Sequence, residues 1–181
     1  MIEIVSYPSD PRSVKLAAII GRSAGVAPEV EAAARDILAQ VREGGDEALC
    51  ALTRKFDKVE MQPERLRMSA EALSSAADGL DPELRVSIEG AAANIRAFHE
   101  RQKLNSWFME DGDGVLLGKK VTPIERVGLC VPAGEVPLFS SLLMTAIPAQ
   151  VAGVDEICVV SPPVADGGVD PTIAATAHCE P

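Results

Sequence analysis

The residues best placed to do chemistry lie in the segment Cys130–Gly134, where an apolar run gives way to a loop. Arg126–Val131 is rich in β-forming residues, and Pro132, Ala133 and Gly134 begin a turn-rich stretch. A loop between the end of a strand and the start of a helix presents backbone N–H groups and the positive end of the helix dipole. These can bind an anion such as a dinucleotide phosphate. Because the GxGxxG spacing is missing, the pattern alone favours a structural turn over phosphate binding.

Histidines, cysteines and carboxylates elsewhere do not form a catalytic or metal-binding pattern. His99 is interpreted as a packed or helix-capping residue, and the adjacent His178-Cys179 pair cannot alone supply the four ligands of a structural zinc site. Met109–Asp113 and Asp155-Glu156 are interpreted as solvated acidic loops. The four cysteines lack CxxC spacing and are interpreted as reduced thiols. Cys130 is expected to be a small buried side chain, a reactive role being the alternative.

Helices are expected to dominate the first part of the chain. Helical spacing of apolar residues predicts helices over 28–43 and 46–56. Gly44-Gly45 ends the first of them, and the two helices are expected to pair as a hairpin. Further helices are predicted over about 70–77 and 82–103, the last capped by Asp81. Short strands over 115–117 and 120–121 are expected to pair as a hairpin.

The second part of the chain predicts a parallel βαβ unit. Its strands are 126–131 and 157–160, and its helix begins at Leu142, capped by Ser140 or Ser141. Pro148 should kink or shorten that helix, and another helix is expected at 172–178. The predicted fold class is α/β. A helical region over residues 1–105 precedes a partial Rossmann-like domain over residues 106–181, which holds the first βαβ unit of an incomplete, truncated parallel sheet.

Composition narrows the classes of partner. A net charge of −10 argues against a protein that binds the phosphate backbone of nucleic acids. There is no apolar run of the length that spans a bilayer and no secretory signal, so a membrane is not an expected partner and the cytoplasm is the expected location. A small molecule or another protein fits better.

Several ordered segments resemble one enzyme family. VREGGDEAL, LTRKFD, NIRAFHERQ, RVGLCVPAG and LLMTAIPAQVAGV occur in the same order as similar blocks of histidinol dehydrogenases, over roughly Val30–Pro163. The resemblance implies an NAD-dependent, zinc-containing homodimer that oxidises L-histidinol to L-histidine in two steps, the last in histidine biosynthesis. The family strand generally reads YVPGG, and its tyrosine contacts NAD. The resemblance therefore carries cofactor binding over to Cys130, Pro132, Ala133 and Gly134, with Cys130 and Ala133 departing from the family pattern.

The resemblance covers only the N-terminal part of the family, whose glutamate–histidine catalytic pair and zinc ligands lie later in the chain. The leading hypothesis is a histidinol dehydrogenase-like chain that is truncated and inactive alone. The alternatives are a non-catalytic interaction module and a relative that oxidises another small alcohol, with its other half on a separate chain. A parallel sheet of two strands leaves an edge and helix-facing surfaces uncovered, which predicts homo-oligomerisation or association with the missing half.

Overall fold

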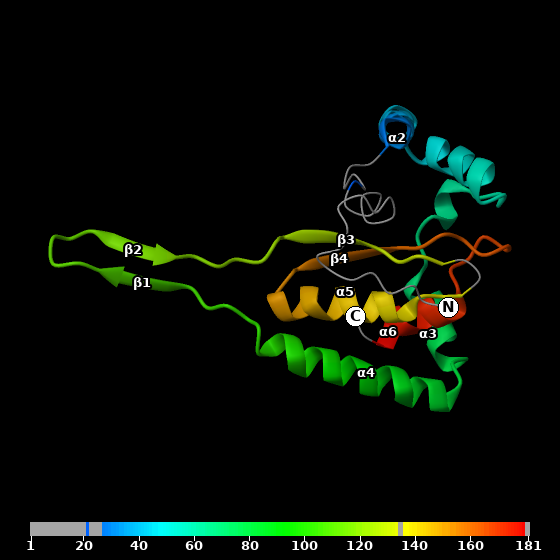
Figure 1. The fold of residues 1–181 in the computed structure, drawn as a ribbon. Coiled ribbons are helices and arrows are strands. Elements are labelled where there is room, and N and C mark those ends of the chain that lie inside the picture. Colours follow the sequence, from blue (N-terminus) through cyan, green and yellow to red (C-terminus); the bar gives the residue numbers. More distant parts are fainter. Residues whose placement is uncertain (1–20, 22–26, 134–135, 180–181) are drawn as a thin grey trace, which may run out of the picture. The chain divides into compact units, whose positions relative to one another are not determined.

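The chain combines helices with two short sheets, which confirms the predicted α/β class. A computed structural model describes residue 21 and residues 27–133 and 136–179 (Figure 1). The chain divides into two compact units, Met1–Ala48 and Leu49–Pro181. The predicted domain boundary between residues 105 and 106 stays a prediction. The elements run α2 (Pro28–Phe56), η1 (Pro63–Arg65), α3 (Ala70–Asp78), α4 (Pro82–Glu100), β1 (Trp107–Glu110), β2 (Leu116–Lys119), β3 (Arg126–Cys130), α5 (Phe139–Ala152), β4 (Glu156–Val160) and α6 (Pro171–Cys179).

Glycine interrupts α2 where the sequence predicts a break. Gly45 leaves the helical region, with φ 57° and ψ −140°, a backbone conformation that residues with a Cβ rarely adopt. The helical segments on either side correspond to the two predicted helices, and their pairing as a hairpin stays a prediction.

Side-chain caps begin the next two α-helices, and the cap at Asp81 confirms the prediction for the second of them. The Ser69 hydroxyl accepts a hydrogen bond from the Ala72 N–H at the start of α3. At the start of α4, Asp81 Oδ1 accepts from the N–H groups of Glu83 and Leu84 at 3.0 and 2.9 Å. These bonds satisfy donors that a helix N-terminus otherwise leaves unpaired. The helix α4 ends at Glu100, three residues before its predicted limit at Lys103.

The antiparallel hairpin exists, but the predicted strand positions were wrong. Trp107–Glu110 pairs with Leu116–Lys119, so a segment interpreted as an acidic loop supplies part of the first strand. The turn is fixed by Asp111, whose Oδ1 accepts from the N–H groups of Asp113 and Val115 at 3.0 Å. Gly114 adopts φ 81° in this turn. The Asp and Gly residues at the turn therefore decide the register.

The βαβ unit is confirmed, with two corrections to its helix. β3 and β4 pair in parallel with Arg126 opposite Glu156, and α5 connects them. The helix begins at Phe139 with Leu138 at the N-cap position and no side-chain cap, so Ser140 and Ser141 do not cap it. It also continues past Pro148 to Ala152, so the proline does not shorten it. Buried residues along α5 hold it together despite the missing amide donor.

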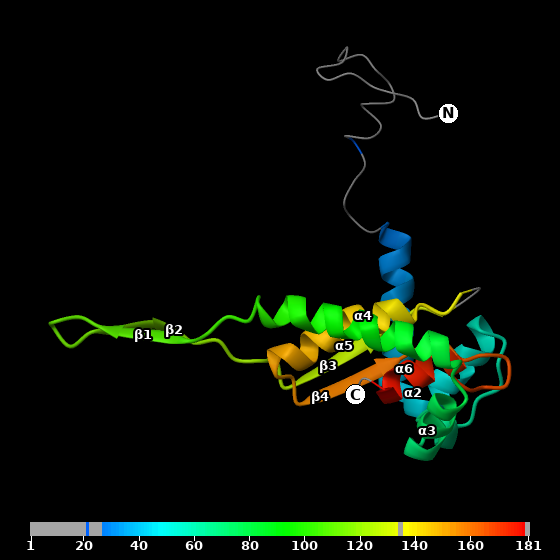
Figure 2. The ribbon, with the colours of Figure 1, turned by 90° about the horizontal axis from the view of Figure 1, so that it is seen from below.

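Within the unit Leu49–Pro181, the helix α5 lies at the centre of the packing. One side of α5 contacts the β3–β4 sheet, another packs on α4, and α6 lies between α5 and α3 (Figures 1 and 2). Two clusters make the core. The first joins α4 to α5 through Ile88, Ala92, Leu143 and Ile147; the second joins β3, α5 and α6 through Val131, Leu142, Ala146 and Ile173. Burial of α5 in both clusters fixes the strand ends relative to the following helices.

None of the helices in the described part of the chain combines the length and the apolar character that crossing a membrane requires.

Candidate functional site

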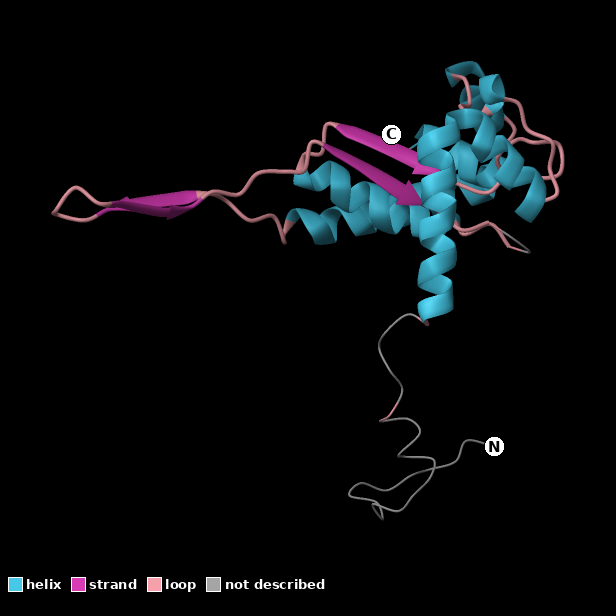
Figure 3. Cartoon of the chain, turned by 90° about the horizontal axis from the view of Figure 1, so that it is seen from above, coloured by secondary structure: helices cyan, strands magenta, loops and turns pink. Residues whose placement is uncertain are grey.

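A partly open cavity lies next to the loops that follow the two parallel strands. β3 and β4 run side by side in the same direction (Figure 3), so both loops leave the same end of the sheet. The cavity measures about 270 Å³ and is lined by Ala133 and Pro137 from the first loop, and by Pro162, Pro163, Val164, Ala165 and Asp170 from the second. Ligands of open α/β sheets bind beyond the carboxyl ends of the strands. The cavity is therefore the candidate binding site.

Two helices begin near this cavity, and they differ in how their N-termini are satisfied. At α6, Asp170 Oδ1 accepts from the N–H groups of Thr172 and Ile173 at 2.8 and 3.4 Å, so a carboxylate already occupies that helix end. At α5, Leu138 supplies no side-chain cap. An added anion would meet repulsion beside Asp170 at α6, whereas the first turn of α5 holds no acidic side chain. Charge thus favours α5 as the anion-binding end.

The loop after β4 is held in place from another element. Arg65 Nη2, in η1, donates to the carbonyl oxygen of Asp166 at 2.9 Å. Within the loop, the Val164 N–H donates to the Gly168 carbonyl at 2.8 Å, and Gly167 takes φ 83°. A Cβ on Gly167 would come within 3.3 Å of the Arg65 guanidinium. These contacts give the cavity a defined wall.

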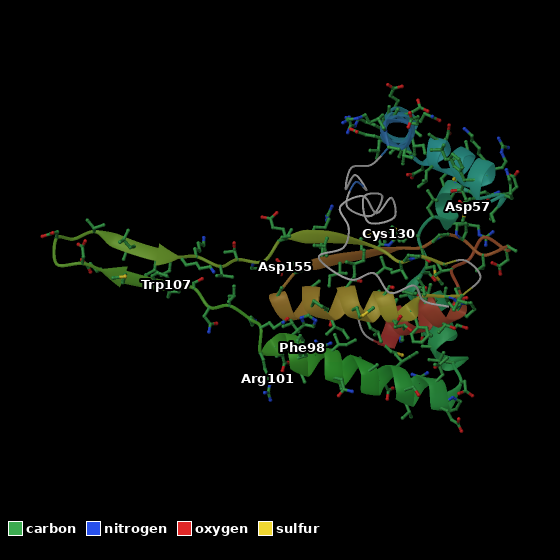
Figure 4. All side chains as sticks on the ribbon, in the orientation of Figure 1. Asp57, Phe98, Arg101, Trp107, Cys130 and Asp155 are labelled. Carbon is green, nitrogen blue, oxygen red and sulfur yellow. The ribbon has the colours of Figure 1, made fainter. Side chains whose placement is uncertain are left out.

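The structure separates the four residues predicted to bind the cofactor. Ala133 is half-buried and lines the cavity, whereas Pro132 is exposed and does not line it. Cys130 (Figure 4) is exposed, so its interpretation as a buried small side chain was wrong. The cause is strand alternation: Val127 and Leu129 point toward the covered side of the sheet, and Cys130 points to the other side. Gly134 lies outside the described residues.

Metal-ligating side chains do not converge in the described part of the chain. Within residues 27–133 and 136–179, no three side chains of His, Cys, Asp or Glu type lie together in a way that could hold a metal ion. Cys179 ends α6, and its Sγ lies 3.4 Å from Arg85 Nη1. The described residues therefore do not fit a zinc site.

Comparisons with known proteins decide the family. The profile described as histidinol dehydrogenase matches residues 21–180. The chain belongs to the histidinol dehydrogenase family. A curated histidinol dehydrogenase of Nitratidesulfovibrio vulgaris is 51% identical over 152 residues, which are 82% of this chain and 35% of the relative. One of Methanosarcina barkeri is 42% identical over 170 residues, 93% of this chain and 39% of the relative.

A solved histidinol dehydrogenase agrees with the fold. The crystal structure of the enzyme from Elizabethkingia anophelis is similar with a TM-score of 0.80 at 33% identity, covering 94% of this chain and 39% of that one. The chain therefore spans little more than a third of the length of the histidinol dehydrogenases it matches.

Two residues that shape the cavity were not singled out from the sequence. Asp170 precedes Pro171 as Asp81 precedes Pro82, so the same capping signature could have located it. Arg65 had no local signal, because the carbonyl that it binds is 101 residues away.

Proposed function

We propose that this chain takes part in the NAD-dependent, two-step oxidation of L-histidinol to L-histidine, and that it supplies part of the NAD-binding surface. The observation that carries the proposal is the family match over residues 21–180, together with a cavity beyond the carboxyl ends of two parallel strands. Histidine biosynthesis in the cytoplasm is the corresponding role. The same match supports a small-molecule substrate.

The described residues fit an anionic part of NAD at one end of the cavity. The first turn of α5 would donate backbone N–H groups to a phosphate, with Ala133 beside it and the loop Pro162–Ala165 as the opposite wall. Asp170 keeps its carboxylate on the N-terminus of α6 and so excludes a second phosphate there. When bound in the complete site, NAD accepts the hydride that the alcohol and then the aldehyde hydrate lose.

Catalysis itself is proposed to need residues beyond these 181. The family resemblance assigns the glutamate–histidine pair and the zinc ligands to later positions, and this chain spans little more than a third of its matched relatives. Its own share is to bind and orient the cofactor. We expect the purified 181-residue chain alone to produce no NADH from L-histidinol.

A chimera tests the proposal directly. Residues 21–180 would replace the matching part of the Nitratidesulfovibrio vulgaris histidinol dehydrogenase, chosen because the two are 51% identical where they match. We expect histidinol-dependent formation of NADH, two equivalents for each L-histidine formed. The unaltered relative is the positive control. A folded chimera that binds NAD and oxidises a different alcohol, but not L-histidinol, would favour another substrate, and a folded chimera that does not bind NAD would overturn the proposal.

A further inference from the structure

The cavity beyond β3 and β4 has room for one part of a dinucleotide. Its volume of about 270 Å³ lies below the roughly 300–1,000 Å³ of pockets that hold drug-sized ligands. Most of its described walls are apolar side chains, from Ala133 and Pro137 in the loop after β3 and from Pro162–Ala165 in the loop after β4. Because an apolar wall offers a charged group no partner, such walls suit a nucleoside better than a phosphate.

Asp170 is the exception in these walls. Of the described residues that line the cavity, it alone carries a charge, and it is half-buried. Its hydrogen bonds to the N-terminus of α6, from the N–H groups of Thr172 and Ile173, both go to Oδ1. In the described part of the chain, no group donates to Asp170 Oδ2. A carboxylate accepts through both of its oxygens, so Oδ2 can still accept from a hydroxyl of a ligand in the cavity.

A cation contacts the same loop without lining the cavity. Arg65 Nη2 donates to the carbonyl oxygen of Asp166 at 2.9 Å, and Arg65 is not among the described lining residues. Dinucleotide sites that accept the 2′-phosphate of NADP place an arginine near it, whereas sites for NAD place a carboxylate that accepts from the ribose 2′-hydroxyl. With Asp170 in its wall, the described lining of this cavity has the second arrangement.

The place of Asp170 in the topology agrees with that arrangement. In Rossmann folds the phosphate binds at the turn after the first strand, and the ribose-binding carboxylate follows the second strand. The corresponding elements here are the loop between β3 and α5 and the loop between β4 and α6. Asp170 lies well beyond Val160, the last residue of β4, but the Val164 N–H donates to the Gly168 carbonyl and closes the loop. The two loops therefore line one cavity.

We propose that Asp170 accepts a hydrogen bond from the 2′-hydroxyl of the adenosine ribose of NAD and thereby selects NAD against NADP, an assignment that rests on the proposed function. The hydroxyl donates to Oδ2 while Oδ1 stays on the N-terminus of α6. In NADP a phosphate monoester, with a charge of about −1.5 to −2 at pH 7, replaces that donor. It would meet the Asp170 carboxylate with no cation among the described lining residues, so like-charge repulsion rejects it.

Two matched substitutions in one loop test the assignment in the chimera described above. Asp170→Asn removes the negative charge and keeps an oxygen that can cap α6. The control, Asp166→Asn, makes the same change of charge on an exposed residue that does not line the cavity, and it keeps an oxygen for the Gly168 N–H. Titrations should show that the unaltered chimera binds NADP about tenfold or more weakly than NAD. Asp170→Asn should reduce that ratio about tenfold, and Asp166→Asn should leave it within about twofold.

The 2′-deoxy analogue of NAD separates the hydrogen bond from the repulsion. It lacks the donor, so the unaltered chimera should bind it about tenfold more weakly than NAD, and Asp170→Asn should reduce this loss because its acceptor is neutral. Circular dichroism of each variant checks that the helices remain folded. A folded chimera that does not bind NAD would overturn the proposed function and this assignment with it. Binding of NAD with no preference over NADP, or the same ratio in both variants, would overturn the assignment to Asp170 alone.

Discussion

Cys130 lies directly opposite Val160 in the parallel β3–β4 ladder, and both side chains are exposed on the side of the sheet away from α5. Gly128 and Cys158 form the neighbouring pair on the same face. Parallel sheets are usually covered on both faces. In the described part of the chain, α5 covers one face and leaves two thiols accessible on the other.

The rate at which each cysteine reacts should follow the exposure of its thiol. Cys130 and Cys158 are exposed, whereas Cys50 and Cys179 are only half-exposed. With a thiol-specific reagent we expect Cys130 and Cys158 to react in a faster phase, because the reagent reaches them without any opening of the fold. Cys130→Ser and Cys158→Ser should each remove about half of the fast amplitude. If the fast phase persisted unchanged in the double variant, the assigned exposure of these strand positions would be wrong.

The residue at position 130 should also affect NAD binding in the chimera. Restoring the tyrosine that the family generally has there, by Cys130→Tyr, adds a ring at an exposed strand end where it can contact a bound cofactor. An aromatic contact of about 0.5–1.5 kcal/mol predicts a two- to tenfold lower dissociation constant for NAD. Titration of the chimera with NAD measures it. The control is Cys158→Tyr, on the same face but opposite Gly128, which should leave NAD affinity unchanged.

The packing of α4 on α5 makes a prediction about stability. Ile147 is fully buried between these helices with Ile88, Ala92 and Leu143. Ile147→Ala should lower the free energy of unfolding by about 2–5 kcal/mol, through lost burial and the cavity left behind. Urea unfolding followed by circular dichroism measures the change. Val86→Ala, at an exposed position of α4, is the matched control and should change the free energy by less than about 0.5 kcal/mol.

The parts of this fold that sequence predicted are those with local causes. Asp81-Pro82 predicts the start of α4 because the carboxylate cap and the fixed φ of proline both act within the first helical turn. The βαβ unit was predictable because two apolar strands flank an apolar helix. The family resemblance located the loop at Cys130–Gly134, and of its described residues Ala133 lies at the cavity.

The sequence-based predictions were wrong where contacts between residues far apart in the sequence decide the local structure. The helix α5 begins before Ser140 because Phe139 packs against both core clusters, a contact that no N-terminal signature announces. The exposure of Cys130 depends on which face α5 covers, which alternation alone does not determine. Arg65 holds the cavity loop across 101 residues, so nothing near Arg65 in the sequence marks its role.

The first turn of α3 should give the stability of the chain a pH dependence. Hydrogen bonds to the carboxylate from the backbone N–H of Glu71 itself, and then from the Ser69 hydroxyl, lower the pKa of Glu71 below its usual 4.5. Because the folded pKa is lowered, this stabilisation is present above pH 4.5 and is lost as the pH falls through the folded value. The stability difference between the unaltered chain and Glu71→Gln should therefore shrink on acidification. Urea unfolding over this pH range measures it. In the Ser69→Ala background the shrinkage should be smaller, and an equal one would rule out the role of the hydroxyl.

The end of α5 depends on a left-handed backbone conformation that only glycine adopts without strain. Gly153 has φ 87° and ψ 33°, and its N–H donates to the Gln150 carbonyl at 2.9 Å, while the Val154 N–H donates to that of Ala149. A Cβ at this position would approach Pro123 Cγ no closer than 3.8 Å, so Gly153→Ala adds backbone strain without a steric clash. We expect it to lower the free energy of unfolding by about 1–2 kcal/mol. Gly153→Asn should cost less, because asparagine tolerates this conformation better. Gly128→Ala is the matched control: it has open space around its added methyl and no positive φ, so an equal loss there would show that the effect at Gly153 does not come from its backbone conformation.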